Sequence, residues 1–240
     1  MYFTFISGEL KKWMRDPMTR FMLFYPVIFG LVGRYGLPSI AENAGFSIEN
    51  NADYIIAALT LMMPMVYGAL IGFSILDDRD DHIFNSIRIT PLNLNSYLLF
   101  RLALVYCLSF TACFFVMWFV QIGPLNENNM ILISFLAAFS APLTGLLINL
   151  FATNKIEGFA IMKLTGIIIL LPVISLYFTD AKELFFAFIP AFWPGKIIST
   201  LVRSEANMLL TLNTYFWIGL LYSIVLNIVM YRSFNHKLSA

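Results

Sequence analysis

Six long apolar stretches constrain the fold of this chain more than any other feature of its sequence. A helix needs about 20 mostly apolar residues to cross the roughly 30 Å hydrocarbon core of a bilayer with its backbone amides paired internally. The six stretches are Phe21–Pro38, Tyr54–Leu76, Tyr97–Ile122, Met130–Ala152, Leu164–Phe178 and Thr214–Tyr231. The fifth is short for a span, and its helix can begin earlier. The sequence therefore predicts an all-α integral membrane protein with six transmembrane helices.

Charged residues make up only 12% of the chain, against roughly 25% in soluble domains, and their distribution predicts its orientation. Loops rich in Lys and Arg stay on the cytoplasmic side of a membrane. If both termini are cytoplasmic, the basic residues on that side are Lys11, Lys12, Arg15, Arg20, Arg79, Arg88, Arg101, Lys155, Lys163, Arg232 and Lys237. Those placed elsewhere are Lys182, Lys196, Arg203 and, near the outer end of the first span, Arg34. We therefore expect both termini in the cytoplasm.

The N-terminal segment, residues 1–20, is typical of an amphipathic interfacial helix. Apolar side chains recur at helical spacing at Phe3, Ile6, Leu10 and Trp13. One face can therefore lie among the lipid headgroups while Lys11 and Lys12 point to water. A cytoplasmic extension of the first span is the alternative. Because no internal repeat relates the two halves of the chain, the sequence predicts one transmembrane domain over residues 1–240.

The connection between the fifth and sixth spans, residues 179–213, is too long for a turn and too apolar for a solvated loop. Its aromatic residues favour the membrane–water interface. Irregular backbone at that depth needs a covering of protein or a cavity. We expect a re-entrant helical hairpin in the outer leaflet, and a plain seventh half-span is the alternative. In the second span, the small-xxx-small pair Gly68 and Gly72 predicts the close approach of another helix.

The positions of the acidic residues argue against two classes of membrane protein. Ion-coupled carriers and proton relays place ionisable groups inside the membrane, and we expect none of the 14 Asp and Glu residues there. With Arg101 assigned to the cytoplasmic end of the third span, the charged residue that we place within a span is Arg34, which can extend outward or pair with Asp53. Intramembrane metal chemistry needs clustered ligands, whereas the two histidines, His82 and His236, are isolated. A self-driven secondary transporter and a membrane metalloenzyme are therefore disfavoured.

The most densely charged segment, residues 78–91, follows the second span. The chain lacks Gly-x-x-x-x-Gly-Lys-Ser/Thr, the loop whose amides bind nucleotide phosphates, so energy for any transport would enter through another chain. Acidic residues begin the segment, apolar residues follow, and Thr90-Pro91 ends any short helix. Asp80 or Asp81 can cap that helix near its positive N-terminus. A charged loop that only stops translocation is the alternative.

The order of residue types in this segment resembles the cytoplasmic loop of type-2 ATP-binding cassette (ABC) export permeases. In that family an acidic-Arg-acidic triplet precedes a small residue, several apolar positions, Thr/Ser-Pro, and a Tyr-Leu that leads to a basic residue. The matching residues here are Asp78-Arg79-Asp80-Asp81, Arg88-Ile89-Thr90-Pro91-Leu92, Tyr97-Leu98-Leu99 and Arg101. His82 stands in place of the usual Gly, and Ile83 in place of a common Thr. The N-terminal helix, six spans and long outer connection extend the resemblance over the whole chain.

This resemblance implies a cytoplasmic coupling loop, residues 77–96, with a coupling helix at about Asp81–Ile89 that docks on a separate nucleotide-binding ATPase subunit. ATP and Mg would bind that ATPase, and no cofactor, metal or nucleic acid is implied for this chain. Six spans form half of such a transporter, so a second permease, identical or paralogous, is implied, in a bacterial plasma (inner) membrane. The residues assigned to ATPase coupling are Asp78, Arg79, Asp80, Asp81, Phe84, Ile87, Arg88, Thr90 and Pro91.

The second and fifth spans are expected to line the transport pathway. Met and aromatic side chains suit varied apolar ligands, which favours export of an amphipathic or hydrophobic compound such as a drug, a peptide antibiotic or a lipid-linked molecule. The candidate lining residues are Met62, Met63, Met65, Tyr67, Ile168 and Tyr177. Ordinary lipid contact and helix packing are the alternative for each of them. For the whole chain, an ATP-independent channel or secondary transporter and a non-transporting anchor for an ATPase remain alternatives.

Overall fold

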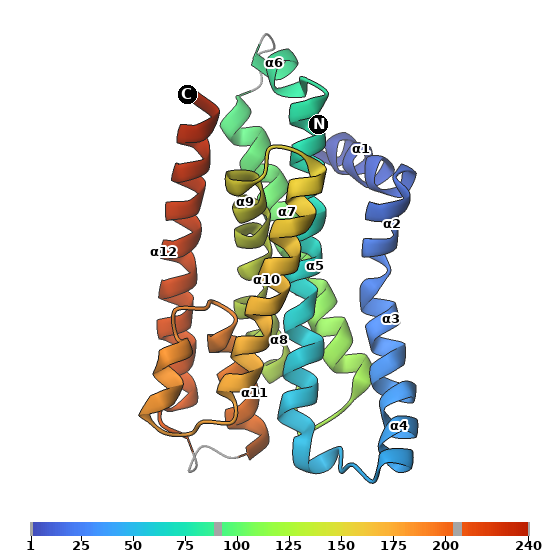
Figure 1. Cartoon of the computed structure of the whole chain (residues 1–240), viewed down its shortest axis with the longest axis vertical. Coiled ribbons are helices and arrows are strands. Elements are labelled where there is room, and N and C mark those ends of the chain that lie inside the picture. Colours follow the sequence, from blue (N-terminus) through green and yellow to red (C-terminus); the bar gives the residue numbers. More distant parts are fainter. Residues whose placement is uncertain (1, 89–92, 204–207, 240) are drawn as a thin grey trace.

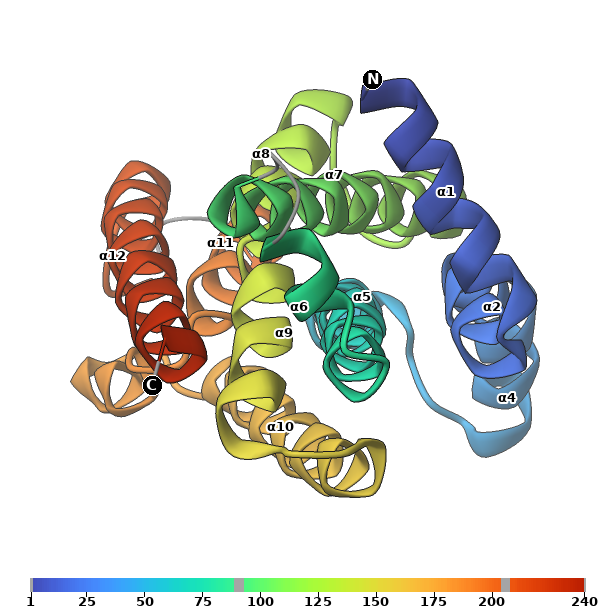
Figure 2. The same cartoon turned by 90° about the horizontal axis from the view of Figure 1, so that it is seen from above.

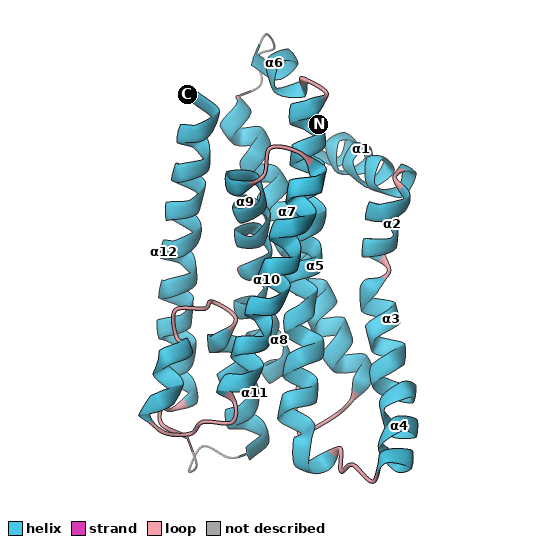
Figure 3. Ribbon diagram, viewed as in Figure 1, coloured by secondary structure: helices cyan, strands magenta, loops and turns pink. Residues whose placement is uncertain are grey.

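The computed structural model describes residues 2–88, 93–203 and 208–239, which fold into helices joined by short loops, with no strand among them (Figures 1 and 3). Five helices in these residues are long and apolar enough to cross a membrane, and a sixth span results if one bent pair of helices is counted as one. Both chain termini lie at the same end of the bundle, which we call the terminal end (Figure 1). The predicted all-α membrane protein is confirmed.

The first predicted span is broken rather than continuous. It comprises α2 (Pro17–Leu23), α3 (Tyr25–Leu31), a π-helical turn (Val32–Gly36) and α4 (Leu37–Ala44), and it bends by 48° after α2. Pro26 near the start of α3 explains the break, because proline has no amide hydrogen for the preceding turn. At the terminal end, α1 (Tyr2–Arg15) turns away from α2 and lies across the bundle (Figure 2).

The remaining spans are long helices that extend beyond most of the predicted limits. They are α5 (Ala52–Asp80), α7 (Leu94–Val120), α8 (Glu127–Ala138) with α9 (Ser140–Phe151), α10 (Lys155–Ser175) and α12 (Leu212–Ser239). The helix of the fifth span starts at Lys155, ahead of the predicted Leu164. The fourth span divides at Phe139, three residues before Pro142. Each of these spans is long enough to cross a bilayer.

The centre of the bundle is the contact between α5 and α9. A Cβ atom added at Gly68 would lie 2.5 Å from the backbone oxygen of Ala141, and one added at Gly145 would lie 3.1 Å from that of Gly68. The buried Asn149 amide donates to the oxygen of Gly72 at 3.0 Å, a polar contact of the kind that joins helices in membranes. The close approach predicted at Gly68 and Gly72 is confirmed.

Helices at the edge of the bundle are far less covered. Within the most apolar part of each span, 78% of α5 is buried, but only 18% of α10 and 17% of α12. Between these two helices the chain forms a 3₁₀ helix, η3 (Ala181–Phe186), and then α11 (Phe192–Arg203), which packs against α12 and α5 at the end away from the termini (Figure 1). Residues 179–203 therefore fold back onto the bundle as a broken helical segment.

Candidate functional site

The short helix α6 (Ile83–Arg88) lies at the terminal end, over the middle of the bundle between the ends of α5, α7 and α9 (Figure 2). It begins two residues later than the predicted coupling helix, because α5 continues through Asp80. His82 in the connecting turn has a φ of 55°, in the left-handed region. Glycine adopts this region without a steric penalty. The geometry gives a physical reason for glycine at this position in the type-2 ABC pattern.

The side chains predicted for ATPase coupling divide into buried and exposed groups. Phe84 and Ile87 are 7% and 8% exposed and pack into the chain's own apolar core in this conformation, and their assignment to ATPase coupling stays a prediction. Asp80 and Asp81 are exposed beside His82. Asp80 is the last residue of α5 and Asp81 is its C-cap, so both lie at the negative end of the α5 dipole, and the capping of the following short helix stays a prediction. The Arg88 side chain, Thr90 and Pro91 lie outside the described residues.

Directly below α6 is a buried cluster of charges, which we call the Arg101 cluster. Its members are Glu9, Lys12, Trp13, Ser74, Asp78, Tyr97 and Arg101. The Arg101 side chain is fully buried, and its guanidinium forms ion pairs with Asp78 and, at 2.9 Å, with Glu9. The second oxygen of Asp78 pairs with Lys12. Two acids thus match two bases inside the protein.

Neutral donors complete the Arg101 cluster. Tyr97 donates to Asp78 at 2.9 Å, and the Trp13 indole donates to the hydroxyl of Ser74 at 3.2 Å. Hydrogen bonds to the remaining atoms offset part of the cost of burying an ion pair, although the Arg101 Nε atom has no partner among the described residues. Because these residues come from three helices, the cluster fastens α1 and α7 to α5 immediately before α6. Asp78 is therefore a buried structural charge, whereas the sequence placed it in a solvated loop.

A second set of contacts at this end ties α5 to α9 and α10. Arg79 donates to the backbone oxygens of Asn149 and Ala152 at the end of α9, at 3.4 Å each. Lys155 at the start of α10 pairs with Asp77 at 2.9 Å. Cations are favourable at a helix C-terminus, where carbonyl oxygens have no partner in the helix. Ion pairs and hydrogen bonds consequently join the last turns of α5 to α1, α7, α9 and α10.

The end away from the termini contains another buried set, the Lys196 cluster. Its members are Asp53, Glu183, Lys196, Ser199, Arg203 and Tyr215. Lys196 and Glu183 are fully buried and pair at 2.7 Å, and Tyr215 donates to Glu183. Arg203 pairs with Asp53 at 2.8 Å. The sequence analysis placed these acids at or beyond the outer surface, but the broken segment brings basic residues over them.

Arg34 has a different partner from the one considered in the sequence analysis. Its guanidinium donates to the backbone oxygen of Phe119 at 2.8 Å and lies 5.2 Å from the centre of the Phe119 ring. Asp53 is occupied by Arg203 and, at 3.0 Å, by Ser199. The suggested Arg34–Asp53 pair is therefore wrong. Among the described residues, no group of three or more His, Cys, Asp or Glu is arranged to hold a metal ion.

The six candidate pathway residues do not form one surface. Met65 and Ile168 line a small cavity of about 80 Å³ between α5, α9, α10 and the segment before α11. Met63 and Tyr67 are buried on another side of α5, where the Tyr67 hydroxyl donates to the oxygen of Leu23 at 3.3 Å. The remaining two side chains, Met62 and Tyr177, are exposed. The structure therefore brings together only Met65 and Ile168.

Comparison with known proteins identifies the family. Residues 9–231 match the family described as fluoroquinolones export permease protein Rv2686c-like. The relatives Rv2686c and MT2760, from two strains of Mycobacterium tuberculosis, are both named fluoroquinolones export permease proteins, and each is 28% identical over 97% of this chain and 93% of its own length. No solved structure matches. The match is consistent with the resemblance to type-2 ABC permeases, and the chain belongs to the Rv2686c-like export permease family.

Proposed function

We propose that this chain is the membrane-spanning subunit of an ATP-driven drug exporter and that a separate ATPase subunit contacts its terminal end. The observation that carries this proposal is the Arg101 cluster directly below α6. A force applied to α6 or to its acidic turn reaches α1, α5 and α7 together, because ion pairs and hydrogen bonds join these helices there. The absence of a nucleotide-binding loop from the sequence supports a separate source of energy.

The proposed assembly contains two permease chains, and the terminal end faces the cytoplasm. The low burial of α10 and α12 leaves apolar faces for a second permease or for lipid. Eleven of the fifteen basic residues fall on the terminal side under this topology, which agrees with the positive-inside rule. ATP and Mg would bind to the partner ATPase in a bacterial plasma membrane.

The proposed substrate is an amphipathic drug of the fluoroquinolone kind. The relatives' names support this class, and it is narrower than the peptide antibiotics and lipid-linked compounds considered from the sequence. The cavity that contains Met65 and Ile168 is a candidate part of the pathway, because it lies between helices of the second and fifth spans. Its volume of about 80 Å³ is below the roughly 300 Å³ of a drug site. Export would therefore require this region to widen.

Co-purification of the tagged full-length chain from its native membrane, with mass spectrometry, tests the proposal. We expect a nucleotide-binding ATPase to accompany the wild-type chain. A variant with Asp80→Lys and Asp81→Lys changes exposed charges only, and we expect its ATPase recovery to fall at least about tenfold. The matched control, Glu42→Lys with Glu49→Lys, reverses two exposed acids at the other end and should keep the ATPase.

Two results would contradict the proposal. If the purified chain alone moved a fluoroquinolone across liposomes without ATP, it would be a channel or secondary transporter. If the ATPase remained bound but drug efflux from cells did not depend on either protein, the chain would be an anchor for the ATPase.

A further inference from the structure

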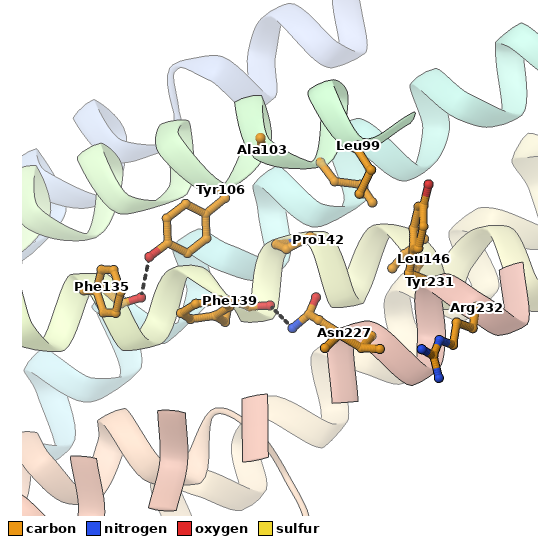
Figure 4. Close-up of a pocket in the computed structure, with 12 residues that line it drawn as sticks. Leu99, Ala103, Tyr106, Phe135, Phe139, Pro142, Leu146, Asn227, Tyr231 and Arg232 are labelled. Atoms are coloured by element: carbon orange, nitrogen blue, oxygen red, sulfur yellow. Dashed lines mark hydrogen bonds between the residues drawn. The ribbon is translucent and has the colours of Figure 1, made fainter. Parts of the chain in front are cut away.

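One apolar groove on the described surface is a feature that the proposed transport mechanism does not use. It has a volume of about 590 Å³ and lies between α7, α8, α9 and α12 (Figure 4). Its walls are mainly aliphatic and aromatic, and Leu99, Phe135 and Ile228 are each more than one-third exposed. The groove therefore opens on the side of the bundle, at the outer surface of the membrane-spanning helices. Its volume lies in the range of about 300–1,000 Å³ that is typical of ligand sites.

The neutral side-chain donors along the groove, Tyr106, Asn227 and Tyr231, are already used by the protein. Tyr106 donates to the oxygen of Phe135 at 3.0 Å, and the Asn227 amide donates to the oxygen of Phe139 at 3.1 Å. Tyr231 donates to the oxygen of Asn95 at 3.3 Å. A ligand with many polar groups would leave them unpaired here, which costs free energy. The body of the groove is consequently suited to a hydrocarbon chain.

One charged residue lines the groove, and it stands at one end. Figure 4 shows Arg232 and Tyr231 at the opposite end from Phe135 and Tyr106. Arg232 is on the part of α12 that approaches the terminal end, and within the described residues its guanidinium has no hydrogen bond or ion pair. Guanidinium groups bind phosphate oxygens in a two-bond geometry. The groove thus combines an apolar body with a cation at the level of one membrane surface.

A second copy of this chain is a poorer occupant. In a two-fold interface the same patch meets itself, so Arg232 would need an acid among the groove residues. The twelve lining residues include no Asp or Glu. An acidic ligand supplies the negative charge that the groove of a second copy lacks.

We infer that this groove binds one acyl chain of an acidic phospholipid whose phosphate contacts Arg232. The apolar walls hold the chain, and the cation selects the acidic headgroup, as basic pockets between transmembrane helices do on the cytoplasmic side. The bound lipid would fill the space between α12 and α7 and stabilise the weakly covered α12 against the bundle.

Native mass spectrometry of the full-length chain in detergent, titrated with phosphatidylglycerol or phosphatidylcholine, tests this inference. We expect the first phosphatidylglycerol to bind more tightly than phosphatidylcholine. Arg232→Gln should weaken the binding of phosphatidylglycerol about fivefold and remove the preference, whereas Arg232→Lys should retain part of it. The control Arg20→Gln removes an exposed arginine at the same end of the bundle and should have no effect.

A second variant tests the body of the groove. Ala103 is exposed in its wall, so Ala103→Trp can fill the space without entering the core, and it should weaken the first binding event for both lipids. Unchanged binding in either Arg232→Gln or Ala103→Trp would overturn the inference. Displacement of the first phosphatidylglycerol by norfloxacin would also overturn it, because the groove would then be a drug site. These measurements need neither ATP nor transport, so their outcome is independent of the proposed function.

Discussion

The Arg101 cluster and the Lys196 cluster lie at opposite ends of the bundle, and both neutralise charged side chains in the interior of the protein. Each matches two basic with two acidic side chains, so neither leaves net charge in the interior. The Arg101 cluster joins three long helices immediately below α6. The Lys196 cluster fastens η3 and α11 against α5 and α12 through Glu183, Lys196, Ser199 and Arg203. Similar chemistry therefore joins helices next to α6 in one case and fastens a broken segment to the bundle in the other.

The largest expected effect separates buried from exposed acids at the same end of α5. Asp78→Ala leaves Arg101 and Lys12 without their shared partner, and the loss of one member of a buried ion pair costs about 3–5 kcal/mol. Asp80→Ala, two residues further on, removes an exposed acid and should change stability by less than about 0.5 kcal/mol. Thermal unfolding of the purified variants in detergent measures the difference. Equal melting temperatures would show that the Arg101 cluster does not hold the helices together.

The second prediction asks whether the Lys196 cluster is only structural. Lys196→Met alone leaves Glu183 buried without a cation and should cost about 3 kcal/mol or more, whereas Lys196→Met with Glu183→Leu removes both charges and should cost less than about 1 kcal/mol. The double variant should also retain drug export. If it folds with the wild-type melting temperature but no longer exports, the comparison between the two clusters fails, because both would then act in transport.

The third prediction concerns the contact that lies between the two clusters. A methyl group at Gly68 would meet the Ala141 backbone at 2.5 Å, so Gly68→Ala should push α9 from α5 and cost about 1–3 kcal/mol. Gly8→Ala in α1 is the matched control, because a Cβ atom there meets nothing within 4 Å. That change should be neutral or stabilise the chain by up to about 1 kcal/mol. Melting curves that coincide for the two variants would argue against a rigid α5–α9 pair.

The membrane fold could be predicted because its signals are local. Apolar length predicted the spans, and the spacing of Gly68 and Gly72 predicted a close helix contact. The burial of charges could not be predicted in this way, because Glu9 and Asp78 reach Arg101 from helices far apart in the sequence. A clue was present in the spacing of Tyr97 and Arg101, which lie four residues apart and so share a helix face.

Amphipathic periodicity was similarly incomplete as a guide to α1. The pattern predicted a helix with Lys12 toward water, but Lys12 and Trp13 both contact α5. Periodicity separates apolar from polar faces, whereas this helix directs a mixed face with Glu9 toward a polar pocket of the protein. The expectation for Lys12 failed because its partner, Asp78, comes from a helix far away in the sequence. Whether such a face points to water or to the protein is decided by ion pairs with other helices.

The smallest effect is expected at His82, in the turn that connects the Arg101 cluster to α6. An L-residue in the left-handed region is strained by about 1–2 kcal/mol, part of which glycine regains at the cost of a more flexible unfolded chain. His82→Gly should therefore stabilise the chain by less than about 1 kcal/mol and leave export unchanged, since the imidazole is exposed. His82→Ala, which also removes the imidazole but keeps Cβ, should show no increase in melting temperature.

Loss of export in both variants would mean that the imidazole itself contacts the ATPase, in addition to Asp80 and Asp81. If export is retained in both variants, the exposed groups of this turn that can contact the ATPase are Asp80 and Asp81, which lie next to the Arg101 cluster.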